Sequence, residues 1–64
     1  MNPLMAVCVD YMRKNKDLKG LQRLLQEARE LQSTFIRRKR IRYMDGVILI
    51  IKKTIQEVEG SELK

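Results

Sequence analysis

The sequence predicts an all-α fold: one domain over residues 1–64, with two to three helices that include a helical hairpin. Apolar residues recur at spacings of three and four along two long stretches, which is the periodicity of one helix face. Residues typical of helix caps and breaks lie where those stretches should begin and end. The small size predicts assembly, because a chain of this length buries only about 60% of its unfolded surface and needs a disulfide, a metal or a partner chain. With one cysteine and no histidine, we expect the partner chain, as a homodimer or as a subunit of a complex.

The first predicted helix covers residues 3–14. Asn2 is a good capping residue, and Pro3 suits the first helical position, where a missing N–H costs no hydrogen bond. As far as Met12 the segment is apolar except for one aspartate, so we expect the helix to be buried on more than one side. Cys8 lies in the middle of this segment and is expected to be a small core residue.

The second predicted helix covers residues 18–43. Asp17 precedes it as a capping residue, and Gly20 falls in its first turn, where a glycine does least harm to a helix. Its apolar stripe, at spacings of three and four, is Leu21, Leu24, Ala28, Leu31 and Phe35.

A third helix is predicted over residues 47–59. The stripe that defines it is Ile41, Met44, Ile48, Ile51, Ile55 and Val58. The six residues from Phe35 to Ile41 rotate a helix by about 600°, so the two stripes cannot lie on one face of a straight helix. The chain must therefore turn between them, or one long helix must show different faces to different neighbours.

Asp45-Gly46 is the strongest turn signal in the chain, and we place the break between the second and third helices there. The alternative keeps the first two helices and closes a β-hairpin at Asp45-Gly46, which the β-prone run 47–51 favours. We prefer helices, because the repeat of three and four continues across the dipeptide.

The charge is strongly positive: 14 Lys and Arg against 8 Asp and Glu, a formal net charge of +6. Five of the six residues in segment 37–42 are cationic, namely Arg37, Arg38, Lys39, Arg40 and Arg42. Arginine forks match the geometry of phosphates and carboxylates. The segment is therefore a candidate contact for nucleic acid or for an acidic protein, and a solvated face that keeps the chain soluble is the third interpretation.

The residue types argue against an enzyme. Without histidine there is no Ser-His or Cys-His pair and no common general base. The carboxylates are scattered, and the glycines form no phosphate loop. We expect no catalytic residue, no cofactor, no metal and no small-molecule substrate. The apolar run 47–51 is too short to span a bilayer, and one cysteine fits a reducing, cytoplasmic location.

The apolar helix faces exceed what so short a chain can cover, and such surplus surface usually marks an interface. We therefore expect a small interaction or regulatory protein that binds a copy of itself and a protein partner. The residues expected at that contact are Leu21, Leu24, Leu31, Ile48, Ile51 and Ile55. The alternative is a dimeric nucleic-acid-binding protein that contacts phosphates through segment 37–42.

Overall fold

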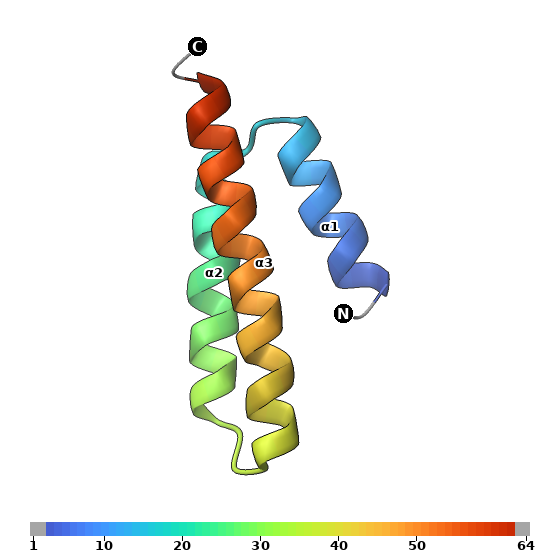
Figure 1. The fold of residues 1–64 in the computed structure, drawn as a ribbon, viewed down its shortest axis with the longest axis vertical. Coiled ribbons are helices and arrows are strands. Elements are labelled where there is room, and N and C mark those ends of the chain that lie inside the picture. The colour runs from blue at the N-terminus through green and yellow to red at the C-terminus, as the bar shows by residue number, and fades with distance from the viewer. Residues whose placement is uncertain (1–2, 63–64) are drawn as a thin grey trace.

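The computed structural model describes residues 3–62 and contains three helices there: α1 (Pro3–Lys14), α2 (Leu18–Ser33) and α3 (Arg38–Glu62). Figure 1 shows α2 and α3 as an antiparallel hairpin along the long axis, with α1 beside the half that contains the end of α3. The all-helical prediction is confirmed, and the alternative with a β-hairpin is not supported, since the described residues contain no strand. The predicted cap Asn2 lies outside the described residues.

The predicted break at Asp45-Gly46 is wrong. The chain turns at residues 34–37, so α2 is shorter than the predicted 18–43 and α3 begins nine residues before the predicted 47. Gly46 has no positive φ, and the Asp45 carboxylate accepts a hydrogen bond from Nε2 of Gln32 at 2.6 Å, which joins α3 to the end of α2. The turn falls between the two apolar stripes, where their phase difference requires it.

Side-chain hydroxyls close the end of α2. Ser33 Oγ donates to the Glu30 carbonyl and Thr34 Oγ1 donates to the Leu31 carbonyl, each at 2.6 Å. The Phe35 N–H then donates to the Gln32 carbonyl at 3.0 Å. These bonds satisfy carbonyls that the next helical turn would otherwise have used, so the helix ends without a glycine.

The connection from α1 to α2 is short and is closed by backbone hydrogen bonds. Lys16 has a positive φ of 53°, and the N–H groups of Lys16 and Asp17 donate to the carbonyls of Arg13 and Met12, the pattern of a Schellman C-cap. The Asp17 side chain then caps α2, as predicted, by accepting from the Gly20 N–H at 3.0 Å. A Cβ on residue 20 would clash with the Asp17 carboxylate, so the glycine leaves room for the cap.

The core lies between the hairpin helices. Leu21 and Ile51 are fully buried at its centre. The other buried apolar residues are Val9, Ala28, Met44, Val47, Ile48, Ile55 and Val58. Thr54 is also buried, and its hydroxyl donates to the Ile50 carbonyl at 2.8 Å, so no polar group is left unsatisfied there.

Helix α1 is less buried than its composition predicts, and this expectation is corrected. Only Val9 is buried, whereas the outward side chains Leu4, Val7 and Tyr11 are 75%, 66% and 68% exposed. The reason is that α1 meets one hairpin along a single stripe, in which Met5 and Met12 flank Val9 against the core.

The C-terminal end of α1 carries its polar contacts. Asp10 pairs with Arg13 and with Lys14, whose Nζ lies 3.1 Å from Asp10 Oδ2. The hydrogen bonds from Lys14 and Arg13 lower the pKa of the Asp10 carboxyl. Arg13 also reaches Glu57 of α3 at 3.9 Å, so this end of α1 is tied to the hairpin.

Replacing Gly46 by alanine should stabilise the protein by about 0.5–1 kcal/mol, since glycine is costly within a helix. A Cβ there meets no atom within 4 Å. Thermal unfolding followed by circular dichroism measures the gain as a rise in Tm of several degrees. Gly20→Ala is the control and should gain less, because the Asp17 carboxylate must leave its capping position. A lower Tm for Gly46→Ala would contradict a continuous α3.

Ile51→Ala should cost about 2–5 kcal/mol, because the side chain is fully buried and its removal leaves a cavity. In a domain this small that is a large part of the total stability. Urea unfolding measures the loss. Leu49→Ala is the matched control on the same helix, with its side chain 52% exposed, and should change stability by roughly 1 kcal/mol or less. Equal losses for the two variants would place the core on a different face of α3.

Candidate functional site

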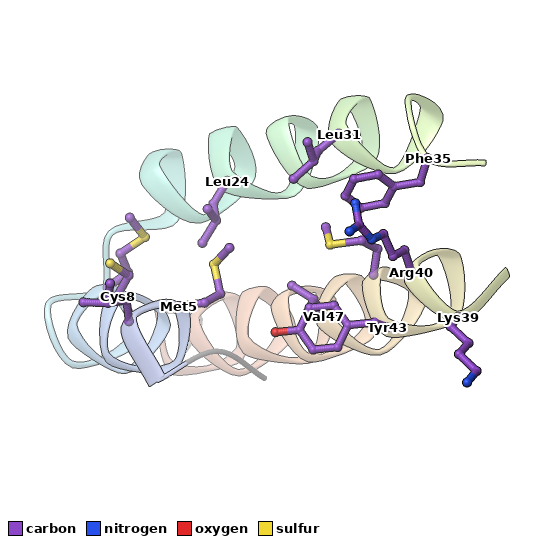
Figure 2. Close-up of a pocket in the computed structure, with 12 residues that line it drawn as sticks. Met5, Cys8, Leu24, Leu31, Phe35, Lys39, Arg40, Tyr43 and Val47 are labelled. Carbon is purple, nitrogen blue, oxygen red and sulfur yellow. The ribbon is translucent and has the colours of Figure 1, made fainter. Parts of the chain in front are cut away.

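An apolar groove of about 690 Å³ lies between α1 and the part of the hairpin nearest the 34–37 turn. Leu4, Met5 and Cys8 line it from α1, and Leu24 and Leu31 line it from α2. Figure 2 shows the side chains of Leu24 and Leu31 extending from α2 toward Met5 of α1 and Val47 of α3. The groove thus collects apolar side chains from all three helices.

The groove is open because the helices differ in length. With a rise of about 1.5 Å per residue, the 12 residues of α1 cover roughly 18 Å, whereas the 25 residues of α3 extend roughly 37 Å. In Figure 1, α1 lies beside one half of the hairpin only. Beside the other half no third helix is present among the described residues, and Leu31 there is 49% exposed.

Aromatic and basic side chains form the end of the groove next to the turn. Phe35 is half-buried, and the Arg40 guanidinium lies 5.9 Å from the centroid of its ring, a cation–π contact. Tyr43 continues this wall along α3, and Lys39 also lines the groove, although its side chain extends away from α2 in Figure 2. The groove therefore has an apolar floor and a positively charged end.

The five predicted cations are brought together at the start of α3, and all are exposed. Arg37 occupies the capping position, since its carbonyl accepts the N–H groups of Arg40 and Ile41 at 3.1 Å. Its side chain cannot accept a hydrogen bond, and the first turn of α3 has no acidic residue. Cations at this end oppose the helix dipole, so the cluster costs stability in the isolated chain.

The structure divides the six residues predicted for a partner contact. Leu21, Ile48, Ile51 and Ile55 are buried within the chain's own core. Leu24 is half-buried and Leu31 is exposed, and both line the groove. The first four would need the hairpin to open before they touch a partner, so an aspartate at Ile51 tests folding rather than assembly.

Cys8 corrects another expectation: it is exposed and lines the groove, and is not part of the core. Sequence reasoning also missed the groove positions Met5, Phe35 and Val47 as a group. The available signal was the length of the first predicted helix, 3–14, which is about half that of the second predicted helix, 18–43, and so leaves part of its face uncovered.

Within residues 3–62, no cluster of three or more acidic or cysteine side chains is arranged to hold a metal ion. Over the same residues, none of the helices combines the length and apolarity that crossing a bilayer requires.

Comparison of the chain with protein-family models, with curated proteins and with solved structures finds no significant match.

Proposed function

We propose that this protein is a non-enzymatic interaction module that binds an amphipathic helix in its apolar groove, with self-association as the first use. The observation that carries the proposal is the groove itself, an uncovered half of a hairpin face lined by apolar side chains of three helices. An added helix would extend the layer that α1 begins. Helix-in-groove binding is a common mode of protein recognition.

The energetics favour such an occupant. Each buried Å² of apolar surface contributes about 25 cal/mol, so covering Leu31 and its neighbours gives a substantial driving force. Lys39 and Arg40 at the end of the groove favour a partner that carries carboxylates beside that end. The apolar face of the occupant supplies the buried area, and carboxylates of the partner supply the charge interaction with Lys39 and Arg40.

Leu31→Asp tests the groove, because a carboxylate there would have to be desolvated against apolar side chains when the occupant binds. Sedimentation velocity over a concentration series should show self-association of the unmodified protein, weakened at least about 10-fold in the variant. Leu49→Asp is the matched control: it is 52% exposed against 49% for Leu31, and it does not line the groove. Equal association of the two variants would argue against the groove.

The second candidate function is nucleic-acid binding through segment 37–42. Its support is the clustering of five exposed cations at the positive end of α3, at the tip of the hairpin. Backbone phosphates placed there would relieve the mutual repulsion of the cations and interact favourably with the helix dipole. Binding of this kind releases counterions and weakens steeply with salt.

Binding to labelled duplex DNA and to single-stranded RNA, at about 50 and 200 mM salt, tests this candidate. The triple variant Arg37→Ser, Arg38→Ser, Arg42→Ser should lose at least about 10-fold in affinity and should show a shallower salt dependence. It keeps Arg40, which contacts Phe35.

The control variant Lys19→Ser, Lys52→Ser, Lys53→Ser removes the same number of exposed cations elsewhere and should bind almost normally. Equal losses of affinity in the two variants would show that binding depends on net charge and not on segment 37–42. No complex at the lower salt would exclude the candidate.

A further inference from the structure

We propose that the groove is filled by α1 of a second copy, in an antiparallel homodimer that places the basic end of each hairpin beside the end of the other that carries Glu57 and Glu59. This inference rests on the proposed function of the groove and specifies its occupant and orientation.

The chain exposes more surface than a compact monomer of its mass, and the excess is similar to the area that each copy buries in a dimer interface. A compact monomer of 7.6 kDa is expected to expose about 4,300 Å², whereas this chain exposes 5208 Å². The excess of about 900 Å² is close to the roughly 800 Å² that each partner buries in a stable interface of standard size. A second copy is therefore of the right size to cover an area of this extent.

Helix α1 is the part of the second copy that fits. The uncovered half of α3 is roughly 19 Å long, about the length of α1. The outward face of α1 is apolar, with Val7 and Tyr11 66% and 68% exposed. From Pro3 to Val9 the helix carries no charged side chain, so burying these turns desolvates no ion.

The other helices present charged outer faces. On α2, exposed Arg23, Glu27 and Glu30 face solvent. On α3 the exposed apolar residues Leu49 and Ile50 are followed directly by charged side chains, Lys52 and Lys53. A two-fold dimer uses the same patch on both copies. Here α1 would cover one half of its own hairpin and the open half of its partner's.

The charges on α3 favour an antiparallel orientation of the two copies. Helix α3 begins with the cations Arg38 and Arg42 and carries the exposed carboxylates Glu57 and Glu59 near its other end, where the helix dipole is negative. Glu57 contacts Arg13 at 3.9 Å, yet its side chain remains 62% exposed. A parallel dimer would place the two basic clusters together, whereas the antiparallel dimer separates them and places each near Glu57 and Glu59 of the other copy. The cations Arg13 and Lys14 lie at that same end, where Asp10 and Glu57 pair with them.

Charge reversal tests the direction. The pair Arg38→Glu, Arg42→Glu and the pair Glu57→Lys, Glu59→Lys should each weaken the dimer about 10-fold at low salt. The four changes in one chain should restore the association. Each pair improves the match to the α3 dipole, but Glu57→Lys also removes the contact with Arg13 of α1. The Tm of each variant is therefore measured beside its association, and lost association counts only where the variant remains folded. In a parallel dimer like charges face each other before and after reversal, so no loss by the single pairs and no rescue would overturn the proposal.

A substitution at Val7 and alkylation of Cys8 test whether α1 of a second copy fills the groove. Val7→Asp, on the outer face of α1, should weaken self-association at least about 10-fold. Cys8 is the only cysteine and lines the groove, so its alkylation by a maleimide should slow as protein concentration rises through the dissociation constant. Alkylation at one rate over that range would overturn the proposal.

Different results would contradict the proposed groove contact and the proposed homodimer. If Leu31→Asp weakens assembly but Val7→Asp and the charge reversals do not, the groove takes another occupant and only this inference is overturned. If Leu31→Asp and Leu49→Asp associate like the unmodified protein, the groove is not the contact and the proposed function fails as well. A chain that remains monomeric at every concentration overturns the homodimer.

Discussion

The packing of two out-of-phase apolar stripes against each other is the constraint on which the rest of the structure depends. One stripe buries Leu21 and Ala28 on α2, and the other buries Ile51 and its neighbours on α3. Because the stripes lie on different faces of a continuous helix, the chain has to turn between Phe35 and Ile41 for them to meet. That turn places the basic segment at the start of α3, and it makes each hairpin helix longer than α1. The basic helix end and the uncovered groove therefore have a common origin.

The sequence predicted the fold where several signals agreed. The bounds of α1 match the prediction, and so do the start of α2 and the cap at Asp17, which precedes an apolar segment. The break failed because Asp45-Gly46 is a local signal in conflict with a longer one. Gly46 costs a helix about 1 kcal/mol, whereas breaking there would disrupt a stripe that buries Met44, Val47 and Ile48 within five residues. The hydroxyl-closed end of α2 has no comparably strong sequence signature.

The candidate site was only partly predictable, for a physical reason. Periodicity identifies which face of a helix is apolar, but the same face can pack within the chain or against a partner. Ile48 and Ile55 pack within the chain, whereas Leu31 lines the open groove. The difference depends on how far α1 extends along the hairpin, and no residue type encodes that distance. Cys8 illustrates this: an apolar context suggested burial, yet its side chain is exposed on the side of α1 that lines the groove.

The basic helix end connects the two candidate functions. Cations at the start of α3 repel one another and oppose the helix dipole, so the isolated chain keeps an arrangement that an anion would relieve. Carboxylates of a second copy and phosphates of a nucleic acid would both provide that relief, and they would compete for Arg38 and Arg42. Dimerisation would also bury apolar surface, an interaction that salt screens weakly, whereas phosphate contacts weaken steeply with salt. Rising salt should therefore release a nucleic acid before it separates the copies, and the apolar groove would be the more persistent of the two contacts.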